Sequence, residues 1–551
     1  MARAATFRVL VFCLISCPAI AQVGSDRLLR ANDEPHNWLT YSGTYFSQRH
    51  SLLGQIDASN VANIELKWVY QAETLTSVST TPLVVDGVMY VTQPPNDILA
   101  LDARSGRTFW TYRYTPTSVP NVCCRGQVNR GLAILGETLF MATIDAHLVA
   151  VDAISGRLLW KVKVAEAKDN YAMTLAPLVI KDKVIVGVAG AEFGIRGFVA
   201  AYHAQTGNET WRFHTVPGPG EPGHETWSKG GDIWKHGGGS VWLTGSYDPE
   251  LNLTYWGTGN PGPDFNPAQR PGDNLYTESV IALDPDTGKL KWYFQFTPND
   301  PYDYDSVQIP VLVDASWNGS ARKLMLWGNR NGFFYVLDRA TGKFLLGRPF
   351  TDLNWARGLD ENGRPVMTPP PPGTPIFPGV NGPGATSWFS PSYSPRTGLF
   401  YLSAQRNAAM VIAPMDVQFT PGRDFRGGIG LPVPGRAPMA GMASPFVNMN
   451  TWHEKNAHGA VIAIDPQTGA QRWTFDMHDI TSSGILTTAG DVLFTGGREG
   501  YFYALDARTG AILWKTRVGA DVASGPMTYA VDGKQYVAVA AGHDIFVFGL
   551  K

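Results

Sequence analysis

Several features are scarce in this sequence of 551 residues, and each scarcity excludes a class of protein. Basic residues number 45 and acidic residues 47, so no excess charge favours nucleic acid or an anionic membrane as a partner. No apolar run beyond the N-terminal stretch is long enough to span a bilayer, so we expect no stable membrane insertion. Cysteine occurs four times, without a Cys/His zinc spacing or a Cys-x-x-Cys-His haem motif. A zinc protein and a c-type cytochrome are therefore excluded.

The N-terminal stretch has the pattern of a secretory signal peptide. Arg3 and Arg8 precede an apolar run from Val9 to Ile15, and Ala19-Ile20-Ala21 is a small-x-small cleavage site. We therefore expect residues 1–21 to be a signal peptide and the mature chain to begin near Gln22. The mature protein is expected to be soluble and exported to an oxidising compartment, the periplasm.

Two of the four cysteines are adjacent. Cys13 and Cys17 lie in the signal peptide, which leaves Cys123 and Cys124 in the mature chain. A disulfide between neighbours would close a small, strained ring that cross-links almost no chain, so it would add little stability. Strain of this kind is usually tied to function. The alternative is a pair of reduced, buried thiols.

A short motif recurs along the chain and indicates a repeat fold. An apolar residue and Asp are followed by Thr or Ser, then Gly, and then Trp four residues later, which reads as strand, turn, strand. The turn needs Gly for positive φ, and the Trp is expected to pack between neighbouring sheets. Copies begin at Leu101, Val151, Ala201, Leu283, Leu337, Ile464 and Leu505, with a worn copy suspected over Ser394–Gly398.

The repeat predicts an all-β fold, an eight-bladed β-propeller with tryptophan-docking repeats. One four-stranded sheet cannot bury both of its faces, so copies must stack, and radial stacking gives a propeller. A β-sandwich with coincidental turns is the alternative. Two Pro/Gly-rich stretches, Pro369–Pro383 and Pro421–Pro445, are too irregular for blade strands and predict long loops over one face, with a disordered linker as the alternative.

Three segments carry oxygen ligands that suit a hard cation. Glu192 lies within a glycine turn, Asn260 lies on a rigid Gly/Pro loop, and Asp303 and Asp305 share one face of an extended segment. Carboxylate and amide oxygens favour Ca²⁺-like ions over zinc. For each carboxylate alone, the alternative is a solvated turn or strand end.

These residues belong to motifs that resemble a known family. Val122-Cys123-Cys124, Val128-Asn129-Arg130-Gly131 and the segment Gly190–Gly197 resemble those of the pyrroloquinoline quinone (PQQ)-dependent alcohol dehydrogenases of the methanol and ethanol dehydrogenase type. The likeness covers nearly the whole mature chain. Further anchors are Trp234–Gly239, Tyr247-Asp248-Pro249, Gly259-Asn260-Pro261, Arg270–Asn274, Thr297–Asp305, Asn329–Gly332 and Pro526–Tyr529.

The resemblance implies a single PQQ-binding propeller over residues 22–551, with the quinone in an axial funnel. The Cys123–Cys124 ring would stack on one face of the quinone and Trp242 on the other. Arg330 matches the residue that contacts its reactive carbonyl oxygens. Residues that match positions holding or lining the quinone are Arg130, Thr174, Ala189, Gly190, Ala191 and Ser240.

The resemblance also implies the chemistry. Glu192, Asn260, Asp303 and Asp305 match metal ligands, and Asp303 also matches the catalytic base. Family members that use Ca²⁺ usually carry Ala, Ser or Thr at the position of Asp305, whereas lanthanide users carry a second Asp. The implied metal is therefore a lanthanide, with Ca²⁺ as the alternative. A further alternative is that Asp305 points away and caps a loop.

The expected activity is oxidation of a small alcohol to an aldehyde, with electrons passed to a soluble cytochrome c. The segment Pro263-Asp264-Phe265-Asn266 departs from the small-alcohol enzymes, where a Trp follows Pro, which speaks against methanol. Alternatives are a PQQ-dependent dehydrogenase for sugars, polyols or polymers, and a non-catalytic scaffold with similar Trp repeats. A homodimer is one option for its assembly.

Overall fold

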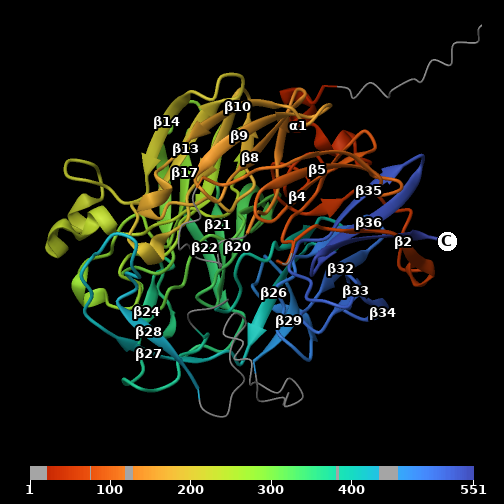
Figure 1. Cartoon of the computed structure of the whole chain (residues 1–551). Coiled ribbons are helices and arrows are strands. Elements are labelled where there is room, and N and C mark those ends of the chain that lie inside the picture. Colours follow the sequence, from red (N-terminus) through yellow and green to blue (C-terminus); the bar gives the residue numbers. More distant parts are fainter. Residues whose placement is uncertain (1–21, 75, 118–127, 380–383, 434–456) are drawn as a thin grey trace, which may run out of the picture.

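The computed structural model describes residues 22–74, 76–117, 128–379, 384–433 and 457–551, and most of its regular structure is β-strand (Figure 1). Eight sheets, each with four antiparallel strands, make up the blades of a propeller. The predicted eight-bladed β-propeller is therefore confirmed. Within the described ranges, every helix is too short or too polar to cross a bilayer.

The first four blades follow the chain without interruption. They consist of β3 (Leu83–Val85), β4 (Val88–Gln93), β5 (Asp97–Asp102) and β6 (Thr108–Tyr112); β7 (Ala133–Leu135), β8 (Thr138–Ala142), β9 (His147–Asp152) and β10 (Leu158–Lys163); β11 (Leu178–Ile180), β12 (Lys183–Gly187), β13 (Phe198–His203) and β14 (Glu209–His214); and β15 (Ser246–Asp248), β16 (Leu253–Gly257), β17 (Ser279–Leu283) and β18 (Leu290–Gln295).

The next three blades contain two insertions. They consist of β19 (Val311–Trp317), β20 (Ser320–Gly328), β21 (Phe333–Asp338) and β22 (Phe344–Pro349); β25 (Ser392–Ser394), β26 (Leu399–Arg406), β29 (His458–Ile464) and β30 (Gln471–Asp476); and β31 (Leu486–Thr488), β32 (Val492–Gly496), β33 (Tyr501–Asp506) and β34 (Ile512–Arg517), joined in parallel by β1 (His50–Ser51). The insertions are the hairpins β23 (Ala356–Leu359) with β24 (Pro365–Met367) and β27 (Met410–Pro414) with β28 (Gly428–Pro432).

Helices are short and lie in the connections. The single α-helix is α1 (Ser25–Leu29) among the described residues, and the 3₁₀ turns include η5 (Ala191–Phe193) and η7 (Ser228–His236). The other 3₁₀ turns are η1 (Ala31–Asp33), η2 (Val61–Asn63), η4 (Ala167–Asp169), η6 (His224–Thr226) and η8 (Pro267–Gln269).

The eighth blade closes the ring with strands from both ends of the chain. β2 (Ile64–Gln71) pairs with β37 (Asp544–Leu550), which pairs with β36 (Lys534–Ala541), and β36 pairs with β35 (Met527–Val531). Figure 1 shows β2, β35 and β36 of this blade near the C-terminus. This blade lacks the repeat turn, which explains why seven clear copies accompany eight blades. Trp68 on β2 supplies the docking residue, because its Nε1 donates to Ala103 O of the first blade at 3.3 Å.

Tryptophan and glycine recur together because each Trp packs on the turn of the next blade. Trp110 Nε1 donates to Ala153 O at 3.2 Å, and a Cβ built on Gly156 would lie 2.6 Å from the Trp110 ring. Gly156 also has φ +72°, so glycine is required here for two reasons: the close approach of the Trp110 ring and the positive φ. The same contact joins Trp68 to Gly106, Trp160 to Gly207, Trp211 to Gly288, Trp292 to Gly342 and Trp473 to Gly510.

One suspected repeat is wrong. The docking turns join the third and fourth strands of a blade, whereas Ser394–Gly398 joins β25 to β26, the first and second strands. It resembles the motif only because a tight hairpin of any kind favours Thr-Gly. The copy at Leu337 that lacks Trp does form a docking turn, with Gly342 packed on Trp292.

The order of the strands separates two ends of the propeller. In an antiparallel blade, the start of the first strand, the connection between the second and third strands, and the end of the fourth strand share one end. The docking turns lie at the opposite end. The β27/β28 hairpin interrupts the connection from β26 to β29, and residues 369–379 precede β25, so the described parts of both predicted long loops belong to the end without docking turns.

Candidate active site

The predicted site residues that the structure describes all lie at the end of the blades without docking turns. Cys123 and Cys124 lie outside the described residues. Those that precede the first strand of a blade are Arg130, Thr174, Ser240, Trp242, Asp303 and Asp305, and those between second and third strands are Ala189, Gly190, Ala191, Glu192, Asn260 and Arg330.

Arg130, Thr174 and Trp242 form one group of contacts. Arg130 is buried, and its Nη1 donates to Thr174 Oγ1 at 2.8 Å. The guanidinium lies 5.0 Å from the centre of the Trp242 ring and 5.3 Å from that of Trp388. Arg130 Nε has no partner among the residues described. A cationic donor beside a partly exposed indole suits a planar ligand with hydrogen-bond acceptors.

A second group centres on Arg330. Its Nη1 donates to Asp305 Oδ2 at 2.7 Å, and its Nη2 lies 3.5 Å from Asp303 Oδ2. The exposed fractions of the three side chains are 7% for Arg330, 15% for Asp303 and 9% for Asp305, so the contacts are largely shielded from water. Asp305 also accepts the backbone N–H of Asn260 through Oδ1 at 2.9 Å. Arg330 and Asn260, which come from neighbouring blades, therefore both contact the carboxylate of Asp305.

The backbone around Asn260 must approach closely. Gly259 N donates to Ser240 O at 2.7 Å, and a Cβ at Gly259 would lie 2.4 Å from Asp305 Oδ1. Only glycine fits between Ser240 and Asp305. The Gly-Asn sequence therefore fixes the backbone N–H of Asn260 next to the Asp305 carboxylate.

Glu192 is held by a tight glycine turn. It lies in η5 between Gly190 at φ +122° and Gly194 at φ +72°. A Cβ at Gly190 would lie 2.3 Å from Asn170 O, which excludes any side chain there. Phe425 N donates to Glu192 O at 2.7 Å, so the loop between β27 and β28 packs on this turn. The predicted loop over the site therefore contacts the turn that carries Glu192.

The charge of the site is dominated by carboxylates. Burial raises the pKa of Asp303 well above its usual value; Arg330 lowers it, and Asp305 and Glu192 raise it further. A cation at these oxygens would offset the repulsion, and the donors are all oxygen atoms, so their chemistry suits a hard cation. Among the described residues, the oxygens of Glu192, Asp303 and Asp305 do not all lie within 4.8 Å of one another.

Sequence reasoning assigned no role to three residues of this region. Asp300 accepts the backbone N–H groups of Tyr302 and Tyr304, and burial raises its pKa to about 6. Glu278 is buried and accepts from Ser306 Oγ at 2.9 Å. The third is Trp388, whose ring lies 5.3 Å from the Arg130 guanidinium. Asp300 lies inside the motif Thr297–Asp305, and that was the available signal; the others become visible only when distant segments fold together.

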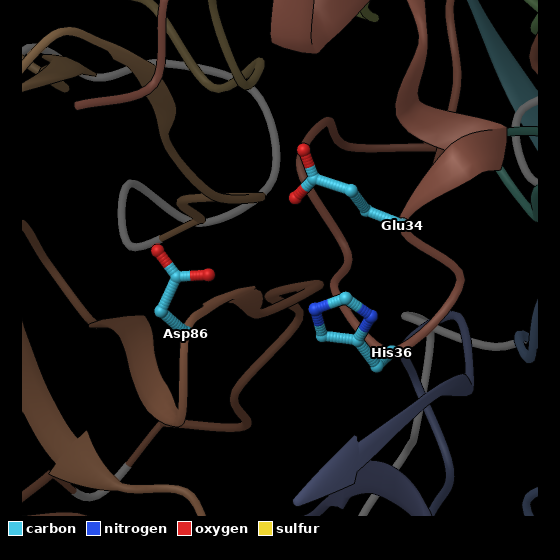
Figure 2. Close-up of side chains that lie close together, drawn as sticks. All are labelled: Glu34, His36 and Asp86. Atoms are coloured by element: carbon cyan, nitrogen blue, oxygen red, sulfur yellow. The ribbon is translucent and has the colours of Figure 1, made fainter. Parts of the chain in front are cut away.

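A different acidic cluster lies elsewhere in the molecule. Among the described residues, the set of His, Cys, Asp and Glu ligand atoms that all lie within 4.8 Å of one another is Glu34, His36 and Asp86. Figure 2 shows the three side chains around a common space. Arg27 donates to Glu34 Oε2 at 2.6 Å and to Asp86 Oδ1 at 2.7 Å, so this cluster already has its cation.

Comparison with known proteins assigns the family. The model of the glucose/ethanol/alcohol dehydrogenase β-propeller domain, named PQQ, matches residues 38–348, and that of the outer membrane protein assembly factor BamB matches residues 457–548. The second match contains none of the predicted site residues.

Relatives agree with the first match over almost the whole chain. The quinohemoprotein alcohol dehydrogenase of Comamonas testosteroni is 38% identical, over 97% of this chain and 78% of its own length. The lanthanide-dependent methanol dehydrogenase of Methylacidiphilum fumariolicum is 36% identical, over 96% and 88%. The solved structure of the quinohemoprotein alcohol dehydrogenase ADHIIG from Pseudomonas putida HK5 matches with a TM-score of 0.88 at 35% identity, covering 96% of this chain and 83% of its own. The chain belongs to the family of PQQ-dependent alcohol dehydrogenases.

Proposed function

We propose that this protein is a periplasmic quinoprotein dehydrogenase that oxidises an alcohol to an aldehyde and passes the electrons to a soluble cytochrome c. The observation that carries the proposal is the buried group of Asp303, Asp305 and Arg330 beside the Asn260 backbone. This sequence carries no Cys-x-x-Cys-His haem motif, and a soluble cytochrome c is the proposed electron acceptor.

The residues divide into a quinone-binding and a metal-binding group. Arg130, Trp242 and Arg330 would hold the quinone by a cationic hydrogen bond, ring stacking and a second cationic contact, with Thr174 orienting Arg130. Glu192, Asn260, Asp303 and Asp305 would hold the cation. When bound, PQQ accepts a hydride from the alcohol carbon, and the cation makes it a better acceptor as a Lewis acid.

Asp303 is the proposed general base. Its carboxylate would take the proton of the substrate hydroxyl, and the burial that raises its pKa makes it a stronger base than an exposed aspartate. Arg330 faces the same carboxylate and limits how far the pKa rises. Burial thus raises the proton affinity of the Asp303 carboxylate, while Arg330 favours its ionised form.

The proposed cation is a lanthanide. Glu192, Asp303 and Asp305 together carry three negative charges, of which Arg330 offsets one, and Asp264, Glu278 and Asp300 are further buried acids of this region. A trivalent ion offsets more of the resulting repulsion than Ca²⁺, and this repulsion is costly in a buried site. Asp305 supports this assignment because its side chain faces Asn260 and Arg330. The family also includes a relative named a lanthanide-dependent methanol dehydrogenase.

Reconstitution tests both parts of the proposal. Metal-free protein is supplied with PQQ and either La³⁺ or Ca²⁺, and the absorption spectrum and alcohol turnover are recorded for wild type, Asp305→Ala and the control Asp286→Ala. Asp286 is an exposed aspartate paired with Lys181 in a docking turn. We expect turnover only with PQQ and metal, a La³⁺ preference in wild type and control, and no preference in Asp305→Ala. Full turnover without quinone and metal would refute the enzyme assignment, whereas equal La³⁺ and Ca²⁺ activity in wild type would refute only the lanthanide.

A further inference from the structure

Asp264 is a buried carboxyl group that the described residues leave without a partner. It lies in the connection between β16 and β17, four residues after Asn260, and its exposed fraction is 0%. Neither Oδ1 nor Oδ2 has a hydrogen-bond partner in the described part of the chain. Burial of an unpaired carboxyl is costly, and a ligand, water or ion that supplies the missing hydrogen bonds would offset that cost.

Asp264 is linked to the segment of the proposed base through Arg270. Arg270 Nη2 donates to both Asp264 O and Asp300 O, and Asp300 lies three residues before Asp303. Burial is the largest cause of the raised pKa of Asp264, and the carboxylates of Asp303 and Glu192 are the next two. Arg426 and Arg270 lower the pKa without donating a hydrogen bond to either oxygen. Asp264 therefore belongs to the same buried region as Asp303 and Glu192.

The backbone around Asp264 is fixed from two sides. Arg270 Nε donates to Pro263 O and its Nη2 to Asp264 O, both at 2.9 Å. From the loop between β27 and β28, Arg426 O accepts the N–H of Phe265 at 2.8 Å. Neither contact uses the Asp264 carboxyl, so its position is set in advance of any ligand.

Charge alone does not assign Asp264 to the metal. Glu192, Asp303, Asp305 and Arg330 sum to two negative charges, and a divalent or trivalent cation can balance them without a further carboxylate. A hydroxyl group is a neutral donor and brings no charge. It can donate to the ionised carboxylate or exchange hydrogen bonds with the protonated acid.

We propose that Asp264 binds a second hydroxyl group of the substrate, so that the alcohol oxidised by this protein is a diol or a longer polyol. This inference rests on the proposed function and names its substrate class. Asp264 acts as a specificity-determining residue: Asp303 takes the proton of the reacting hydroxyl, while Asp264 holds a hydroxyl on a nearby carbon. A site built for a hydroxyl discriminates against the analogue that lacks it, because the buried carboxyl then stays unpaired.

The test compares two alcohols of equal chain length. With holoenzyme carrying PQQ and metal, kcat/KM is measured for propane-1,2-diol and propan-1-ol in wild type, Asp264→Leu and Asp264→Asn. We expect wild type to prefer the diol by about tenfold or more, as for a hydrogen bond to a charged group. Asp264→Leu should remove this preference, mainly through a higher KM for the diol, and should raise the melting temperature of the ligand-free protein. If the Asp264→Leu variant does not fold, the same comparison of the two alcohols is made with Asp264→Asn, which removes the carboxylate charge.

The matched control is Asn266→Leu, which removes a polar group from the same segment. Asn266 Nδ2 donates to Met415 O at 3.1 Å and Asp416 Oδ1 at 3.0 Å, so we expect a lower melting temperature and an unchanged substrate ratio. A wild-type ratio near one, or a ratio that Asp264→Leu leaves unchanged, overturns the inference. So does equal loss on both alcohols with weaker metal binding in a titration, which would make Asp264 a metal ligand. If wild type oxidises neither alcohol with PQQ and any metal, it is the proposed function that has failed.

Discussion

The buried pair of Asp248 and Arg339 should contribute more to stability than any exposed ion pair of this protein. Both side chains have an exposed fraction of 0%, and Arg339 Nε donates to Asp248 Oδ2 at 2.7 Å. The other carboxylate oxygen accepts the N–H groups of Glu250 and Leu251 at 2.9 and 3.1 Å. Asp248→Ala would remove both the charge partner of Arg339 and the cap of the β15–β16 turn.

The structure gives the size of the effect. Removing one partner of a buried pair costs about 3–5 kcal/mol. The low end, about 3 kcal/mol, applies here because Arg339 keeps a contact to Asp314 at 2.7 Å. The two lost backbone hydrogen bonds add about 1 kcal/mol each. The expected loss for Asp248→Ala is therefore about 4–5 kcal/mol.

A double-mutant cycle checks this reasoning. Asp248→Ala, Arg339→Met and the double variant are unfolded in urea and followed by tryptophan fluorescence. We expect the double variant to be more stable than the sum of the single effects by about 2–3 kcal/mol, because neither charge is then left unpaired. Asp248 lies at the docking-turn end of its blade, so turnover per folded molecule should be unaffected. A loss below about 1 kcal/mol for Asp248→Ala, or strictly additive effects, would refute the argument.

Three further predictions concern the base, pH and the docking turns. Asp303→Asn should lower turnover by about 10²- to 10⁴-fold without lowering the melting temperature; Asn is the right probe because Asp303 has φ +58°, which Asn tolerates better than Ala, and near-normal turnover would remove Asp303 as base. Burial lowers the pKa of His50 to about 4, so the unfolded chain takes up a proton first and stability should fall by about 2–3 kcal/mol as pH drops from 6.5 to 4. His50→Gln should flatten this dependence in melting curves, and an unchanged slope would exclude His50 as its source. Trp110→Phe should cost about 1 kcal/mol in urea unfolding through the lost bond to Ala153, and no loss would show that ring packing alone joins the blades.

The sequence could predict the parts of the fold that depend on neighbouring residues. The docking turn is local, since Asp102 caps it, Gly106 supplies positive φ and Trp110 follows at fixed spacing, so the repeat predicted an eight-bladed propeller. The eighth blade has no such turn and is closed by β2 from the other end of the chain. Its pairing depends on ring closure, which no local pattern encodes.

The same distinction applies to the site. Gly190 and Gly259 could be recognised as special because close approach forbids a side chain, and each lies next to a predicted metal ligand. The pairing of Arg330 with Asp305 joins two connections of one blade, and that of Asp248 with Arg339 joins residues from neighbouring blades. Such pairs are set by how the strands meet in space. The sequence marked Asp264 as a departure, and burial without a partner gave the departure a physical meaning.

The two ends of the propeller carry opposite demands. At the docking-turn end, Trp side chains pack on glycine turns and donate hydrogen bonds between blades, which favours folding. At the other end, burial raises the pKa of Asp264, Glu278, Asp300 and Asp303, so keeping these groups buried and ionised opposes folding. The closed ring couples the ends, because each blade holds its neighbours in place through contacts far from the carboxylates. The repeated Trp contacts at the docking-turn end therefore offset the loss of stability that the buried acids cause at the opposite end.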